Sequence, residues 1–166
     1  MYSIQIKDIV SRGKEGLFSL YRSVGWINYC NTPHMLEKAY ENSLCALGAY
    51  SGNRLIGVIR AVGDGYSILY IQDLIVSPSF QRMGIGSLLL KKLIERFPDV
   101  YQTVLLTDHQ PDTIRFYQTN GFSIADQVGC TGMLRIKNKK QKSCPGMCYP
   151  HTPGRLILHQ KGFYII

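Results

Sequence analysis

The part of the sequence that could do chemistry most directly is a glycine-spaced turn between an apolar run and a helical pattern. Residues 73–87 read Asp-Leu-Ile-Val-Ser-Pro-Ser-Phe-Gln-Arg-Met-Gly-Ile-Gly-Ser. The first amides of a helix have no backbone partners, and the helix dipole adds roughly half a positive charge there. Gly84 and Gly86 let the backbone come close to an anion, while Arg82 adds a charge and Ser87 a hydroxyl. We therefore expect residues 81–87 to wrap a diphosphate.

An isolated G-x-G is more often a simple turn, so the surrounding residues decide the interpretation. The run lacks the third glycine of G-x-G-x-x-G and the G-K-[ST] ending of a P-loop, so it is neither of the familiar nucleotide loops. Gln81-Arg-Met-Gly84-Ile-Gly86 instead resembles the acyl-CoA loop, [QR]-x-x-G-x-[GA], of the GCN5-related N-acetyltransferase (GNAT) superfamily. Val76-Ser-Pro78 resembles the strand end that precedes this loop in the family.

A second motif, 30 residues further along the chain, agrees with the first. The segment from Phe116 to Phe122, Phe-Tyr-Gln-Thr-Asn-Gly-Phe, is similar to the family's F-Y-x-x-x-G-F segment. The resemblance covers about residues 2–137 and is specific between residues 66 and 122. Within the superfamily, the chain most resembles small bacterial members with a Y-[IV]-Q-D-L strand and a T-D-x-x-P segment, here residues 70–74 and 107–111. The acceptor substrate does not carry over from this likeness.

The resemblance implies where acetyl-CoA would bind and which residue would act as the acid. In these enzymes the fourth and fifth strands splay apart, and the pantetheine arm lies in the wedge between them. The cofactor-binding residues implied here are Leu74, Ile75 and Val76 on the strand and Gln81, Arg82, Met83, Gly84, Ile85, Gly86 and Ser87 on the loop. The motif tyrosine, Tyr117, would protonate the departing CoA thiolate, although a tyrosine at this helical spacing would otherwise be read as a core residue.

An attacking amine must lose a proton, so a base is needed as well. Asp73 is the best-placed carboxylate at the strand end, and it could instead stabilise the loop electrostatically; Asp108, His109 or a chain of waters are alternative bases. Gln72 alternates to the other face of the strand and is a candidate contact for acceptor or cofactor. Three further residues either line the acceptor pocket or pack at the surface: Trp26, Tyr29 and His34.

The hydrophobic pattern alternates between strand and helix periods, which indicates an α/β (α+β) fold. We expect strands over residues 2–7, 44–50, 54–62, 66–76, 100–108, 122–126 and 130–136. We expect helices over residues 15–24, 35–43 (opened by Pro33), 84–97 and 111–120. With the resemblance, this predicts a mixed, mostly antiparallel central sheet of about seven strands flanked by about four helices.

The length of the chain and the distribution of its charge predict one folded domain followed by a basic extension. The chain has 166 residues, enough for one sizeable core, and its net charge is +8. Residues 138–166 contain five Lys and Arg and no acid, which leaves only +3 for residues 1–137. We therefore predict a GNAT domain over 1–137 and a basic, proline-containing extension over 138–166. Five cysteines without a signal sequence or a transmembrane segment predict reduced thiols in the cytoplasm.

The extension permits two other functions, which its composition does not favour. Cys144, Cys148, His151 and His159 lack the paired spacing of common zinc sites, so no metal is expected. Its basic character could suit RNA or anionic lipid, yet Tyr149 is its sole stacking candidate before the terminal residues, so nucleic acid is an unfavoured partner. The resulting hypothesis is an N-acetyltransferase that moves an acetyl group from acetyl-CoA to a primary amine, with no membrane partner and with a homodimer left open. The alternative is a catalytically weak acyl-CoA-binding or protein-partner module of the same fold.

Overall fold

The computed structural model describes residues 3–9 and 16–135. Its elements alternate between strands and helices, in agreement with the predicted fold class. The predicted extension over 138–166, together with its zinc and RNA alternatives, lies outside the described residues. The boundary predicted at residue 137 therefore stays a prediction.

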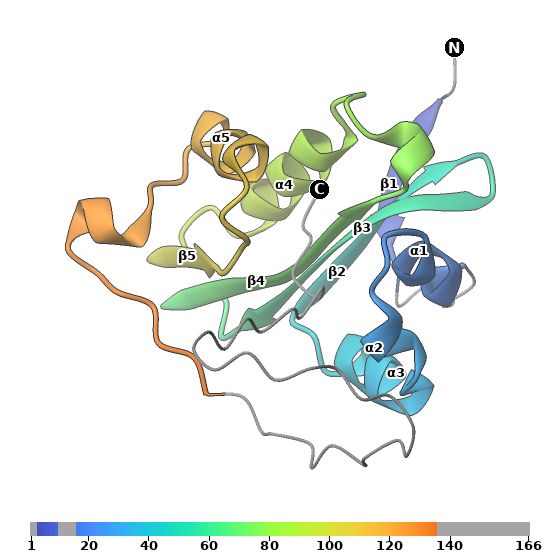
Figure 1. Cartoon of the computed structure of the whole chain (residues 1–166), viewed down its shortest axis with the longest axis horizontal. Coiled ribbons are helices and arrows are strands. Elements are labelled where there is room, and N and C mark those ends of the chain that lie inside the picture. The colour runs from blue at the N-terminus through green and yellow to red at the C-terminus, as the bar shows by residue number, and fades with distance from the viewer. Residues whose placement is uncertain (1–2, 10–15, 136–166) are drawn as a thin grey trace, which may run out of the picture.

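A five-stranded sheet forms the centre of the described chain (Figure 1). The strands lie in chain order: β1 (Ile4–Asp8), β2 (Cys45–Ser51), β3 (Arg54–Gly63), β4 (Ile68–Val76) and β5 (Gln102–Leu105). Neighbours are antiparallel from β1 to β4, whereas β5 runs parallel to β4. The crossover between β4 and β5 contains a helix, as a parallel pair requires.

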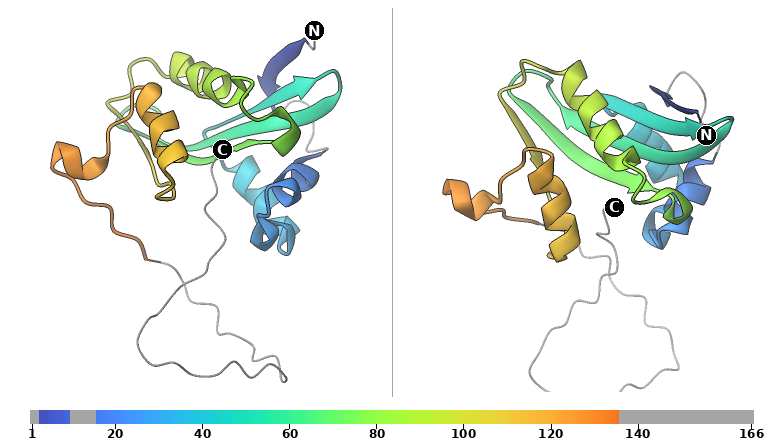
Figure 2. Two further views of the ribbon diagram at one scale, coloured as in Figure 1. Left: turned by 45° about the horizontal axis from the view of Figure 1, so that its top comes forward. Right: turned by 90° about the horizontal axis from the view of Figure 1, so that it is seen from above.

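Helices cover both faces of this sheet (Figure 2). One face carries α1 (Leu17–Ser23), α2 (Ile27–Cys30) and α3 (Pro33–Glu41), and the other carries α4 (Ile85–Arg96). The helix α5 (Pro111–Thr119) follows β5 and lies beside α4. On α4, Leu89 and Leu93 are fully buried four residues apart, which confirms the apolar stripe expected for this helix.

The pairing of β4 with β5 ends well before β4 itself ends. The last register pair is Ile71 with Leu105, and β4 continues to Val76 without β5 beside it. The register between β3 and β4 also shifts at this place, because Arg60 pairs with Asp73 and Ala61 with Ile71. Gln72 is therefore an extra residue in β4, and such a bulge bends its strand. The two strands separate here, as the resemblance implied.

The two strands predicted over 122–126 and 130–136 are wrong within the described residues. Residues 125–128 form a short 3-10 helix, η2 (Ala125–Val128), and residues 130–135 are irregular. The Cys130 amide donates to the Ala125 carbonyl, which closes a local turn, and Met133 is 93% exposed. An alternating pattern makes a strand only where a neighbour and a core face are available. Residues 123–135 are exposed, and no strand of the described part of the chain pairs with them. Over residues 3–9 and 16–135 the structure has five strands, not about seven. It has five α-helices rather than about four, because the single turn of α2 was not predicted.

Candidate functional site

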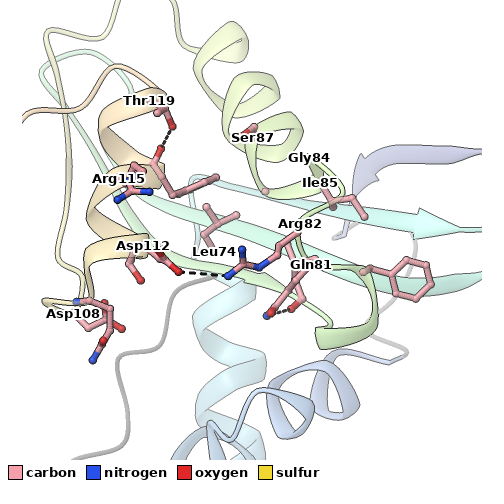
Figure 3. A pocket seen from close by; sticks show the side chains of 16 residues that line it. Leu74, Gln81, Arg82, Gly84, Ile85, Ser87, Asp108, Asp112, Arg115 and Thr119 are labelled. Atoms are coloured by element: carbon pink, nitrogen blue, oxygen red, sulfur yellow. Dashed lines mark hydrogen bonds and ion pairs between the residues drawn. The ribbon is translucent and has the colours of Figure 1, made fainter.

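A pocket of about 530 Å³ lies where the predicted loop, the end of β4 and α5 meet (Figure 3). Its lining residues come from two stretches of the chain, residues 74–87 and residues 108–119. They are Leu74, Val76, Phe80, Gln81, Arg82, Gly84, Ile85, Gly86, Ser87, Asp108, Gln110, Asp112, Thr113, Arg115, Phe116 and Thr119. The pocket therefore contains most of the cofactor-binding residues that the sequence analysis named.

The loop before α4 is held in one conformation by its own side chains. Gln81 Nε2 donates to the carbonyl of Val76 at 3.1 Å, which ties the loop back to the last residue of β4. Arg82 and Gly84 both have left-handed backbone, with φ of 60° and 76°. No side chain caps α4, and its first backbone hydrogen bond runs from Leu88 to Gly84. The preceding amides, at residues 85–87, are thus available to an anion.

The two glycines of the loop have different purposes. A Cβ built on Gly84 would meet no atom within 4 Å, so this position borders open space and needs glycine for its positive φ. A Cβ on Gly86 would lie 3.3 Å from the Phe116 ring. Gly86 therefore lets α5 approach α4, and a further contact between the two helices runs from Asn120 Nδ2 to Ser87 Oγ at 3.3 Å. Both glycines shape the pocket, Gly84 through the backbone and Gly86 through helix packing.

The predicted residues of β4 divide between the two faces of the sheet. Leu74 and Val76 line the pocket, whereas Asp73 and Ile75 are buried and absent from its lining. This division is the alternation of a strand. Of the loop residues, Met83 is exposed and does not line the pocket.

Tyr117 lies next to the pocket rather than on its wall. Its ring packs edge-on against Phe116 and Phe122, with centroids 5.1 and 5.7 Å away. The hydroxyl is buried and has no hydrogen-bond partner among the described residues. Burial, and to a smaller extent the charge of Asp108, raise the pKa of Tyr117 well above its usual value. The side chain therefore holds its proton at any physiological pH.

Asp73 is enclosed on the opposite face in an ion pair with Arg60, the residue opposite it on β3. Arg60 also donates to Ser43 Oγ at 3.3 Å and lies over the Tyr40 ring, whose hydroxyl is 3.1 Å from that of Tyr21. Burial raises the pKa of Asp73, against the opposing effect of Arg60. The pair fixes the two strands directly beside the bulge at Gln72.

The three residues suggested for an acceptor pocket lie in different surroundings. Trp26 and Tyr29 stack at 5.7 Å within an aromatic cluster that includes Tyr21, while His34 is exposed. Burial raises the pKa of Tyr29, and a hydrogen bond between its hydroxyl and the Gln72 side chain offsets part of this rise. Trp26 is a core residue, whereas Tyr29 and Gln72 are half-buried at the rim of this face.

The sequence analysis missed the contribution of α5 to the pocket. The missed lining residues on this helix are Asp112, Thr113, Arg115, Phe116 and Thr119. Their spacing of three and four residues places them on one helix face. This periodicity can be read from the sequence. It indicates a pocket wall only once α5 is known to pack beside the loop.

Two findings concern metals and membranes. The described residues contain no group of three or more His, Cys, Asp and Glu side chains that could hold a metal ion. Within the same residues, no helix is both long enough and apolar enough to cross a bilayer.

Comparison with known proteins identifies the class. The sequence profile described as the acetyltransferase (GNAT) family matches residues 15–122, so the chain belongs to the GNAT family. A solved GNAT-family acetyltransferase from Streptococcus pneumoniae is 41% identical, with a TM-score of 0.72, and the match covers 84% of this chain and 100% of that one. The resemblance stated from the two motifs is thereby confirmed.

Sequence relatives extend the family beyond bacteria. The chain is 28% identical over 152 residues to "GCN5-related N-acetyltransferase 1, chloroplastic" of Arabidopsis thaliana, covering 85% of this chain and 77% of the relative. It is 28% identical over 139 residues to an uncharacterized N-acetyltransferase of Porphyra purpurea, covering 79% of each. Because one relative is named as chloroplastic, the cytoplasmic location stays a prediction.

Proposed function

We propose that the protein transfers an acetyl group from acetyl-CoA to a primary amine of a small molecule or peptide. The observation that carries this proposal is the uncapped beginning of α4, which borders a pocket of about 530 Å³ beside the part of β4 that no longer pairs with β5. A diphosphate at the amides of residues 85–87 would place the pantetheine arm along Leu74 and Val76. Membership of the GNAT family supports the same donor.

In the proposed reaction, the neutral amine attacks the thioester carbonyl carbon, a C–N bond forms and the C–S bond breaks. Beyond Ile71 the β4 amides that point away from β3 have no β5 residue opposite them, so they are suited to stabilise the oxyanion of the tetrahedral intermediate. Tyr117 would give its proton to the CoA sulfur. Its enclosed hydroxyl has no competing partner among the described residues, which favours donation to a group that enters the wedge.

The amine's proton needs an acceptor, and Asp73 was the predicted base. In the structure its carboxylate has no exposed surface and is paired with Arg60, so direct contact with an amine would require this pair to open. Asp108, one of the alternatives, lines the pocket and lies close enough to Tyr117 to raise its pKa. The pH–rate profile of Asp73→Asn distinguishes the two carboxylates. If the rate of this variant still depends on the deprotonation of a general base, that base is a residue other than Asp73.

The enclosure of Asp73 is also the observation that favours a second candidate, an acyl-CoA-binding module with little turnover. Thiol release from acetyl-CoA, measured over a panel of polyamines, aminoglycosides, amino acids and N-terminal peptides, separates the two functions. We expect release that depends on one amine class. Tight binding of acetyl-CoA in calorimetry with no amine-dependent release would favour the binding module, and absence of both would contradict the proposal.

A further inference from the structure

An ion pair crosses the pocket between the loop and α5. Arg82 Nη2 lies 3.4 Å from Asp112 Oδ2, and Figure 3 shows the two side chains directed toward each other. Both residues line the pocket. The pair therefore lies in the space that a ligand of the α4 N-terminus would have to enter or border.

The charges around this pair do not suit a highly anionic ligand as they stand. Arg82 and Arg115 line the pocket, but Asp108 and Asp112 line it as well. These four side chains have no net charge, while the donor under the proposed function carries several phosphate charges. Asp112 lies in the first turn of α5, where the helix dipole favours an acid, and it also sets a negative charge beside the ligand's space.

The Arg82 side chain can change its partner more easily than the loop backbone can change its conformation. The loop backbone is tied to β4 through Gln81, and the left-handed φ of 60° at Arg82 fixes the direction in which its side chain leaves the loop. The side chains of Arg82 and Asp112 are 89% and 75% exposed. An ion pair this exposed is weak, so a stronger anion can replace Asp112 at small cost.

We propose that Asp112 is a positioning residue that holds Arg82 across the pocket and is exchanged for the diphosphate of the incoming ligand. The exchange rests on the proposed function for its natural ligand, acetyl-CoA. Asp112 keeps Arg82 at the mouth of the pocket and lowers the affinity for anions that cannot displace it. Its removal should therefore tighten binding, in contrast to the removal of an ordinary binding residue.

The test compares Asp112→Asn with wild type in calorimetric titrations of acetyl-CoA and of inorganic diphosphate. At low salt we expect about two- to fivefold tighter binding of both, the range given by one exposed ion pair, and a smaller gain at high salt. The matched control is Asp99→Asn, which removes the same charge from an exposed residue beyond the other end of α4 and should change affinity less than 1.5-fold.

An Arg82→Gln background separates exchange from simple repulsion. If Asp112 acts through Arg82, Asp112→Asn should give no gain in that background. Unchanged or weaker binding by Asp112→Asn alone, or the full gain in the Arg82→Gln background, would overturn the exchange. Wild type that binds diphosphate but not acetyl-CoA, with the gain present, supports the exchange and refutes the proposed donor; wild type that binds neither refutes both.

Discussion

Two Arg–Asp pairs lie on the two sides of β4, and they differ in almost everything except residue type. Arg60 and Asp73 are 6% and 0% exposed, are opposite each other on β3 and β4, and are enclosed by Tyr21 and Tyr40. Arg82 and Asp112, in contrast, lie at the mouth of the pocket with most of their surface in solvent. The first pair is buried within the fold, whereas the second lines the pocket.

This difference shows that burial, rather than residue type, decides what an ion pair can do. Neither partner of a buried pair can separate without a large desolvation penalty, so the Arg60–Asp73 pair fixes the strand beside the bulge. Solvent screens an exposed pair and replaces either partner at small cost. One arginine and one aspartate thus form the fixed pair beside the bulge, and another arginine and aspartate form the exchangeable pair at the pocket.

The largest expected effect concerns the buried pair. Asp73→Asn should lower the free energy of unfolding by about 3–5 kcal/mol, because it leaves the Arg60 charge buried without its partner. Asp112→Asn is the matched control and should cost less than about 1 kcal/mol. Urea unfolding measures both. Equal effects of the two variants would erase the distinction between the pairs.

Replacing both buried partners tests the same point from the other side. The double variant Arg60→Met/Asp73→Leu should regain most of the stability lost in Asp73→Asn, since no uncompensated charge remains. Retained thiol release in the folded double variant would show that Asp73 is not the base.

A second large effect is expected for Tyr117, beside the pocket. Tyr117→Phe should reduce kcat by about 10²–10⁴, the usual contribution of a general acid, with little change in the dissociation constant of acetyl-CoA. Because the pKa of Tyr117 is raised, the wild-type rate should show no loss attributable to this group up to pH 9. An unchanged kcat in the variant would remove the acid role.

A smaller effect is expected at Gly84. Gly84→Ala places a Cβ at a positive φ and should cost about 1–2 kcal/mol of folding stability. Gly52→Ala in the β2–β3 turn is the matched control, because Gly52 also has a positive φ and open space around it. Both variants should lose similar stability in thermal unfolding, and Gly84→Ala alone should bind acetyl-CoA more weakly. Equal affinities would remove the loop from the binding site.

The smallest effect is expected for a second exposed pair, Asp8 with Arg96. Hydrogen bonds from Arg96 lower the pKa of Asp8, so the ionised carboxylate stabilises the fold above the unfolded pKa of about 3.9 and this contribution disappears as the pH falls through the folded value. Asp8→Asn should cost about 0.2–1 kcal/mol at pH 7 and nothing at the lowest pH where the protein still folds. A cost that persists in acid would point to packing rather than charge.

The sequence predicted the elements whose pattern is local and missed those that depend on distant neighbours. The stripe of Leu89 and Leu93 and the proline that opens α5 are readable from short windows, and α4 and α5 were predicted to within one residue at each end. The strands expected from residue 122 onward have the right alternation, but no strand within residues 3–9 and 16–135 pairs with them. Short-range pattern does not contain that information.

The same limit applies to the site. The loop and Tyr117 were identified through two short motifs, and the loop residues do line one pocket except for Met83. The pairing of Asp73 with Arg60 depends on the register of two strands, and the approach of Asp112 to Arg82 depends on how α5 packs. Spacing along the chain cannot supply either contact.

The most direct test of the account is an amide-resolved NMR titration of the full chain with acetyl-CoA. The account predicts that the largest shifts fall on the amides of residues 81–87 at the beginning of α4 and on those of residues 74–76 in β4. Saturating acetyl-CoA that leaves these amides unchanged, or that shifts mainly residues of the α1–α3 face, would contradict it.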